Sequence, residues 1–227
     1  PLREIFHGTG IRIAQGVVES IDRESRVIKI AGHHHGCSIT YDYLLIATGA
    51  ETNYYDIPGA EKFALPLKSL LDAARIRSRI IDNFEQAILT TDKVERARLL
   101  SFVVVGGGAT GVETAAELAE FIRGMVKRYY NATVDSGTYD HRVCKPEEPL
   151  ISLIHTGSEV LQTFKQSLRV SAAKRLRDEN ILLHLDSTVA EVSNQGIKLT
   201  SGAAIPSAAV IWTTGVKPII PHFEGTM

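Results

Sequence analysis

The stretch FVVVGGGATGVETAAEL, residues 102–118, decides the fold. Residues 102–105 are aromatic and β-branched, as in a strand buried on both faces of a parallel sheet. Residues 112–120 are rich in Ala, Leu and Glu, which favour helix. Between these segments, residues 106–111 carry the spacing G-x-G-x-x-G. A strand, a glycine-rich turn and a helix in this order predict a dinucleotide-binding turn inside a β-α-β unit.

The three glycines of this turn have distinct expected roles. Gly106 makes the tight turn, Gly108 lets the backbone approach a pyrophosphate, and Gly111 lets the helix pack closely on the strand. The N–H groups of the first helical turn, together with the helix dipole, receive the negative charge. The alternative is a tight strand-helix turn that binds nothing. We assign cofactor binding to Gly106, Gly107, Gly108, Ala109, Thr110 and Gly111.

The composition limits the partners and the compartment. The 227 residues are 44% hydrophobic and have a formal net charge of −1. Because this balance offers no basic surface for DNA or RNA, we expect no nucleic-acid partner. Cys37 and Cys144 form neither a C-x-x-C pair nor a metal-ligand spacing. With two isolated cysteines and no apolar run near the ~20 residues of a spanning helix, a cytoplasmic location is expected.

The residues before residue 67 predict a small meander and a crossing between two domains. Strands are expected at residues 11–18, 27–30 and 38–41. Residues 43–47, YLLIA, indicate a buried strand that runs directly into a Thr-Gly turn. Residues 53–66 are interrupted by Pro and Gly, so we expect an irregular crossing there.

Two short motifs are expected to have no functional role. His33, His34 and His35 lie in the Gly-flanked connection 32–36, where a metal site would need ligands from elsewhere in the fold. A solvent-exposed loop explains the three histidines without further ligands, so we expect no metal. The N-x-T spacing at Asn131 matches a glycosylation acceptor, but without a secretory signal in this sequence we expect it to be unmodified.

The rest of the chain predicts a β-α-β domain with a second meander. Ser69 is a suitable N-cap for a long helix whose apolar residues recur near the 3.6-residue period. Residues 129–149 are polar and aperiodic, which indicates a long excursion. The expected elements are helices at 69–89, 93–100, 112–120 and 164–179, strands at 102–105, 151–155, 181–185 and 209–213, and an antiparallel meander at 191–205.

The two parts of the chain end alike, with A-T-G at residues 47–49 and T-T-G at residues 213–215. This doubled ending resembles the two-dinucleotide-fold flavoproteins of the glutathione reductase type. In that superfamily one Rossmann-like domain holds FAD and an inserted one holds NAD(P)H. The stretches YDYLLIATGAETNYYDIPGAEKFALPLKSLLDAARIRSRI and FVVVGGGATGVETAAELAEFI are similar to type II NADH dehydrogenase, the single-chain NADH:quinone oxidoreductase. The similarity covers nearly the whole chain.

The resemblance implies a fold class and a domain organisation. The fold class is α/β, a Rossmann-like parallel sheet with a β-meander, accompanied by a piece of an FAD domain. Residues 1–58 are expected to be a partial FAD-binding domain, residues 59–215 the NAD(P)H-binding domain, and residues 216–227 the start of the return linker. The family's first glycine-rich turn and its later Gly-Asp for FAD do not occur in this sequence. We therefore expect an internal segment that purifies without flavin and is inactive on its own.

The resemblance also assigns site residues outside the turn. In the superfamily the Glu two places after the third glycine lies near the nicotinamide and the flavin, which makes Glu113 the expected catalytic position. The alternative is a first-turn Glu that favours the helix dipole. Gly215 and Val216 are expected to line the nicotinamide end. Thr48 and Gly49 are expected to face FAD in the intact protein.

His155 stands where the family usually has an acidic residue for the adenosine ribose diol. A neutral imidazole can still bond a ribose hydroxyl, whereas a protonated one would favour a 2′-phosphate. No Arg follows immediately, so we favour NADH and keep NADPH as the alternative.

The function implied by the resemblance is hydride transfer from NADH to FAD and then to a quinone. NADH is therefore the expected partner of this segment, and a quinone is the acceptor of the intact protein. Peripheral association with the cytoplasmic face of the membrane through a C-terminal part, and a homo-oligomer, are compatible with the family. The alternatives are a ferredoxin- or disulfide-reductase-like flavoprotein, and a nucleotide-binding module without turnover of its own.

Overall fold

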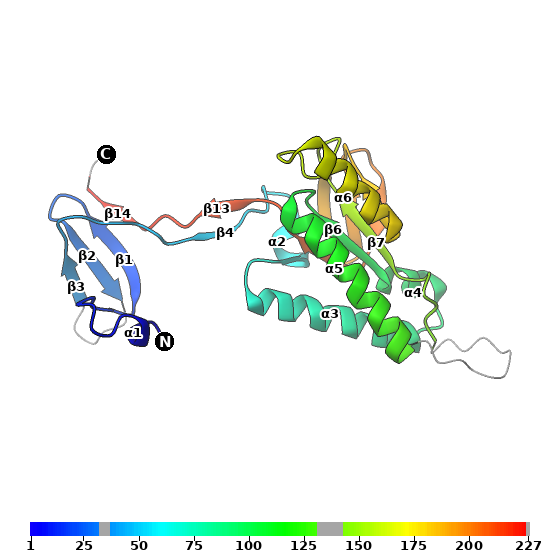
Figure 1. Cartoon of the computed structure of the whole chain (residues 1–227), viewed down its shortest axis with the longest axis horizontal. Coiled ribbons are helices and arrows are strands. Elements are labelled where there is room, and N and C mark those ends of the chain that lie inside the picture. The colour runs from blue at the N-terminus through cyan, green and yellow to red at the C-terminus, as the bar shows by residue number, and fades with distance from the viewer. Residues whose placement is uncertain (32–36, 131–142, 226–227) are drawn as a thin grey trace. The chain divides into compact units, whose positions relative to one another are not determined.

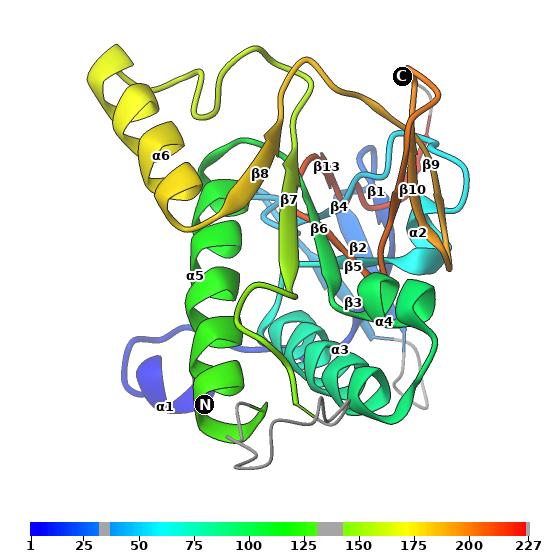
Figure 2. The same cartoon turned by 90° about the vertical axis from the view of Figure 1, so that its right-hand side faces the viewer.

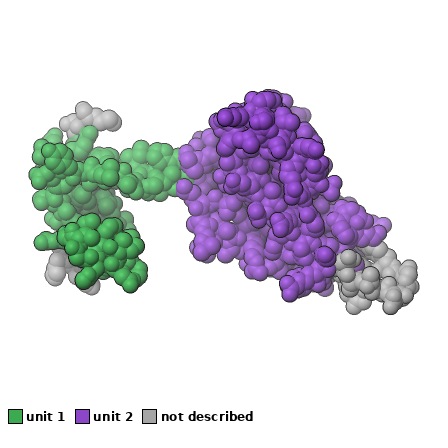
Figure 3. Space-filling view, viewed as in Figure 1, with its two compact units in different colours: residues 1–51, 217–227 green, residues 52–216 purple. Residues whose placement is uncertain are grey.

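The computed structural model describes residues 1–31, 37–130 and 143–225 (Figure 1). The chain divides into two compact units, shown in different colours in Figure 3. The larger unit is continuous, residues 52–216, and the smaller unit combines residues 1–51 with the chain from residue 217 onward. Assignment of these units to FAD and NAD(P)H domains stays a prediction.

The larger unit is built on a five-stranded parallel sheet with the order β5-β12-β6-β7-β8. Residues 102–105 lie in the central strand and are all buried, as expected of a strand covered on both faces. Phe102 pairs with Ile151 in parallel, which confirms the predicted β-α-β unit. The strands are β5 (Ala64–Pro66), β6 (Ser101–Val105), β7 (Leu150–Ile154), β8 (Ile181–His184) and β12 (Ala209–Trp212).

Helices cover one face of this sheet (Figure 2). Phe84 and Phe102, both fully buried, stack with their ring centroids 6.1 Å apart in this layer. Ser69 begins the long helix through a capping box, because its hydroxyl accepts from the Asp72 N–H and the Asp72 carboxylate accepts from the Ser69 N–H. The helical segments are α3 (Leu70–Leu89), α4 (Lys93–Leu99), α5 (Ala109–Met125), the π-helical η1 (Val126–Tyr130) and α6 (Gln166–Asp178).

An antiparallel meander and a short helix cover the other face. Trp212 is the large side chain of this layer; its indole N–H donates to the Asn53 carbonyl at 3.0 Å, and its ring lies 5.8 Å from that of Tyr54. The predicted second meander is confirmed. The elements are α2 (Ala60–Phe63), β9 (Val189–Ser193), β10 (Gly196–Leu199) and β11 (Ala204–Pro206).

The smaller unit contains a four-stranded sheet with the order β14-β1-β2-β3. Its buried apolar side chains among the described residues are Ile21 and Ile30, so its core is small. Strands β4 and β13 pair as a separate two-stranded sheet. The elements are α1 (Leu2–Ile5), β1 (Val17–Asp22), β2 (Val27–Ala31), β3 (Cys37–Thr40), β4 (Ala50–Thr52), β13 (Val216–Pro218) and β14 (Phe223–Glu224).

One predicted strand of the smaller unit is displaced and another is absent. Residues 11–16 have no regular structure, and β1 begins at Val17. Residues 43–47 form no strand, and the side chains of Tyr43 and Leu45 are 97% and 89% exposed. A strand needs partner backbone groups, and no described strand of this chain pairs with either segment.

Two segments expected to be irregular carry regular structure. Residues 53–66 contain α2 and β5, because β5 pairs in parallel with β12 and completes the edge of the sheet. Tyr129 and Tyr130 belong to η1, and the Tyr130 hydroxyl donates to Glu85 at 2.6 Å. The predictions for His33, His34, His35 and Asn131 lie outside the described residues.

Two kinds of feature are absent from the described residues. Among those residues, no three or more side chains of His, Cys, Asp or Glu are grouped as a metal ion would require. None of the helices there has the length and apolar character needed to cross a membrane.

Candidate functional site

The glycine-rich turn follows β6 at the carboxyl edge of the parallel sheet. Gly106 has a φ of +122°, which favours glycine, and its N–H donates to the Ile154 carbonyl at 2.8 Å. A Cβ at Gly111 would overlap the carbonyl oxygen of Gly106, so only glycine lets α5 approach the turn this closely. A Cβ at Gly108 would meet no atom within 4 Å. The geometry at Gly106 and Gly111 fits a tight turn and close helix packing, and the approach of a pyrophosphate to Gly108 stays a prediction.

The amino terminus of α5 presents backbone N–H groups to an open surface. Gly108, Ala109 and Thr110 are exposed, and no side chain caps the helix. The first N–H groups of a helix have no intrahelical partner, and they carry the positive end of the helix dipole. The turn can therefore accept an anionic group beside Gly108.

His155 lies directly against this turn. Its Nδ1 accepts a hydrogen bond from the Gly107 N–H at 3.2 Å, and a Cβ at Gly107 would overlap its ring. Burial lowers the pKa of His155 below its ordinary value of 6.5, and the nearby Asp186 charge only partly opposes this shift. Because an accepting Nδ1 requires the unprotonated form, the imidazole is neutral near pH 7. The structure thus brings His155 and the glycine turn together, 48 residues apart in sequence.

A cavity of about 270 Å³ opens beside His155 at the same edge of the sheet. Strands β6, β7 and β12 supply its walls where they end, and Trp212 at the end of β12 is among the lining residues. The residues from the predicted site that line it are Gly106 and His155. The volume is below the ~300–1,000 Å³ of pockets that enclose drug-sized ligands. The cavity alone is therefore too small to enclose a whole dinucleotide.

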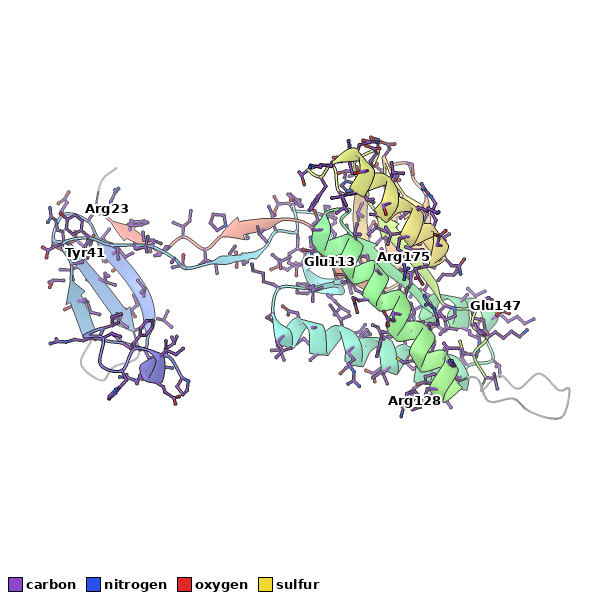
Figure 4. All side chains as sticks on the ribbon, in the orientation of Figure 1. Arg23, Tyr41, Glu113, Arg128, Glu147 and Arg175 are labelled. Carbon is purple, nitrogen blue, oxygen red and sulfur yellow. The ribbon has the colours of Figure 1, made fainter. Side chains whose placement is uncertain are left out.

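Glu113 lines a different hollow. It is exposed in the first turns of α5 (Figure 4) and borders a groove of about 550 Å³ between α3 and α5. Thr110 borders the same groove, together with Arg77 of α3. The structure therefore places Glu113 near the turn but not in the cavity lined by His155. Its catalytic role stays a prediction.

The remaining predicted residues belong to two units. Gly215 has a φ of +74° and its carbonyl accepts from the Asn53 N–H at 3.2 Å in the larger unit, next to Val216. Thr48 and Gly49 lie in the smaller unit. The Thr48 hydroxyl donates to the Ile219 carbonyl, and the Gly49 carbonyl accepts from the Ile219 N–H at 3.2 Å.

Sequence reasoning missed Tyr55. Its ring packs on Gly215, where a Cβ would approach Tyr55 Cε2 to 2.6 Å, and it lines the cavity beside His155. Tyr55 and Asp56 both adopt left-handed backbone conformations, with φ of 53° and 54°. The short polar run around Asn53 signals a turn, but nothing local indicates that this turn folds over the second T-G motif.

A family model described as pyridine nucleotide-disulphide oxidoreductase matches residues 5–225. The chain belongs to this family. An external alternative NAD(P)H-ubiquinone oxidoreductase of Arabidopsis thaliana mitochondria is 37% identical over 193 residues, which covers 82% of this chain and 31% of the relative. A probable NADH dehydrogenase of Dictyostelium discoideum is 33% identical over 95% of this chain and 46% of its own length.

The structural comparison agrees with the sequence comparison. NDH2 of Plasmodium falciparum, solved in complex with NADH, superposes with a TM-score of 0.76 at 29% identity. The match covers 89% of this oxidoreductase-family chain and 40% of that protein. The predicted resemblance to type II NADH dehydrogenase is confirmed. The chain spans about a third to a half of the length of the curated relatives it matches.

The two half-buried histidines predict that the free energy of unfolding falls in acid. Burial lowers the pKa of both His155 and His184 below 6.5, so the folded state binds protons less readily than the unfolded chain. Their stabilising effect is present above pH 6.5 and is lost as the pH falls below that value. We expect the free energy of unfolding, followed by Trp212 fluorescence, to decline from pH 7 to pH 5.

A double variant separates these histidines from other titrations. His155→Gln with His184→Gln should flatten the decline, whereas His7→Gln, at an exposed position, should leave it unchanged. A double variant as acid-sensitive as the wild type would show that other groups cause the loss.

Proposed function

We propose that residues 52–216 bind NADH, with the pyrophosphate at the amino terminus of α5 and the adenosine ribose beside His155. The observation that carries this proposal is the open space at Gly108, next to uncapped N–H groups and framed by the close contact between Gly111 and Gly106. Support also comes from the similarity to NDH2, whose solved complex contains NADH.

The chain's own residues would bind and orient the nucleotide. The exposed N–H groups of Gly108, Ala109 and Thr110 would donate to the pyrophosphate, because they lack partners within the helix. The Nε2 of His155 would contact a ribose hydroxyl, since Nδ1 is engaged by Gly107. Gly215, held under the Tyr55 ring, would lie towards the nicotinamide.

We further propose that the longer protein passes electrons from NADH to FAD and then to a quinone. The flavin, when bound, supplies the hydride acceptor and the two-electron delivery. Thr48 and Gly49 would contribute little to holding it, because the hydroxyl proton of Thr48 and the carbonyl of Gly49 already bond to Ile219. Glu113 would act at the nicotinamide side, as its place in the first turns of α5 allows.

Calorimetric titration with NADH and NADPH tests the nucleotide site. The wild type should bind NADH, and the neutral His155 supports a preference for the ribose diol over a 2′-phosphate. His155→Glu should raise the ratio of NADH to NADPH affinity roughly tenfold or more, because a carboxylate accepts from both hydroxyls and repels the phosphate. The proposal is wrong if the wild type binds neither nucleotide.

His155→Gln is the matched control for this experiment. Glutamine has the length of glutamate but no charge, so its affinity ratio should stay close to that of the wild type. An identical ratio in His155→Glu and His155→Gln would show that residue 155 does not read the ribose.

A further inference from the structure

The larger unit contains a second hollow at the opposite, amino-terminal edge of its parallel sheet. It has a volume of about 470 Å³ and is lined where β5 and β12 begin, by the second half of α3 and by the turn between β9 and β10. The glycine turn lies at the other ends of these strands, so this hollow is no part of the nucleotide site. Nothing in the family resemblance assigns it a ligand.

Two cations at this hollow have no acidic partner. Lys62 and Arg79 are exposed, and no carboxylate of the described chain lies within ion-pair distance of either. Arg79 makes a single long contact, from Nη1 to the Ala208 carbonyl at 3.5 Å, and the Lys62 ammonium lies 4.9 Å from the centre of the Phe63 ring. Asp82 is the carboxylate among the lining residues. The charges of Lys62, Arg79 and Asp82 at the rim therefore sum to a net positive charge.

The third cation of the lining is already satisfied. Arg98 binds both carboxylate oxygens of Glu95, at 2.8 Å and 2.7 Å, and donates to the Asn194 carbonyl at 3.0 Å. This pair fixes the Arg98 side chain and leaves Lys62 and Arg79 as the groups able to receive an anion.

Asn83 lines the hollow and has a buried amide nitrogen without an acceptor. The residue is 3% exposed, it lines the hollow, and its Nδ2 has no hydrogen-bond partner among the residues described. Buried polar groups in folded proteins are hydrogen-bonded, and an amide nitrogen can only donate. The missing partner must therefore accept hydrogen bonds. Gln86 and Gln195 add amide groups to the same lining.

We propose that this hollow binds a phosphate group, with Lys62 and Arg79 neutralising the charge and the side-chain amide of Asn83 turning to donate to one oxygen. A phosphate is acceptor-rich, and both Lys and Arg are suited to bind it. The hollow is larger than the group itself, so either inorganic phosphate or a small organic phosphate fits.

Thermal unfolding of the full chain with inorganic phosphate tests the proposal. Phosphate should raise the melting temperature more than potassium chloride at equal ionic strength, and the side-chain amide resonance of Asn83 should shift in nuclear magnetic resonance spectra. The double variant Lys62→Gln with Arg79→Gln should bind phosphate roughly 100-fold more weakly, since two charge-assisted bonds are lost. Both side chains are exposed, so the variant should fold.

Further variants locate the effect. Arg77→Gln removes a charge from the same helix at a residue that lines another hollow, and it should keep the full phosphate response. Because the glycine turn can itself accept an anion, the double variant is also made in the Gly108→Val background; Gly108→Val alone should keep a phosphate response, and adding Lys62→Gln and Arg79→Gln should remove it. No response in Gly108→Val, its persistence in the triple variant, or an equal response to chloride would overturn the proposal. A stronger response to glycerol 3-phosphate than to inorganic phosphate would identify an organic phosphate as the ligand, and the reverse order would identify the free ion.

Discussion

Replacing Gly108 with valine is expected to abolish NADH binding while leaving the fold intact. The backbone at Gly108 is extended, with φ of −77° and ψ of −174°, which valine adopts without strain. The new Cβ would meet no protein atom within 4 Å, so the branched side chain would fill the space assigned to the pyrophosphate. We expect calorimetry to show affinity at least ~100-fold weaker, equivalent to about 2.7 kcal/mol.

Gly124→Val is the matched control for this variant. Gly124 lies in the same helix, is exposed, and also has open space around the position of a Cβ. Valine is a better helix former than glycine, so this variant should be at least as stable as the wild type and should bind NADH normally. Equal NADH affinity in Gly108→Val and Gly124→Val would place the nucleotide elsewhere.

Replacing Arg96 with methionine is expected to give the largest loss of stability. Arg96 is 7% exposed and joins α4 to two other segments: it binds the Ala87 carbonyl of α3 at 2.7 Å, and in the chain before β7 it binds Glu148 at 2.7 Å and the Val143 carbonyl at 2.8 Å. Methionine would remove the charged partner of the partly buried Glu148 carboxylate, which would keep the Lys145 N–H, and the guanidinium donor of two carbonyls. The expected cost is about 3–5 kcal/mol, measured by denaturant unfolding with Trp212 as the probe.

An exposed arginine provides the comparison. Arg175, labelled in Figure 4, pairs with Glu179 at 2.7 Å, but its side chain is 75% exposed. Arg175→Met should cost no more than about 1 kcal/mol, because water screens a surface ion pair. Similar losses for both variants would contradict the structural role assigned to the buried guanidinium.

The NADH proposal has two parts, the pyrophosphate position and the ribose position, and an experiment can contradict either one without the other. Loss of binding in Gly108→Val locates the pyrophosphate, whereas a changed nucleotide preference in His155→Glu locates the ribose. Neither experiment requires flavin or quinone, so both discriminate a nucleotide-binding segment from a chain that binds no nucleotide. Electron transfer to a quinone is a separate property of the longer protein, and its test is steady-state NADH oxidation by that protein.

The sequence by itself determined the central strand, the glycine turn and the helices that follow the 3.6-residue period. These features depend on neighbouring residues: a positive φ at Gly106, a capping box at Ser69 and a buried run at residues 102–105 are local requirements. The family resemblance followed from the same local motifs, and the match over residues 5–225 confirmed it.

Only the tertiary structure decided which segments find partners. Residues 43–47 have the composition of a buried strand but are exposed, whereas β5 emerged from a stretch expected to be irregular because β12 lies beside it. In the same way, His155 meets the Gly107 N–H and Tyr55 covers Gly215 through contacts between segments distant in sequence. Strand pairing and side-chain contact depend on the surface that a distant segment presents. A local sequence pattern carries no information about that surface.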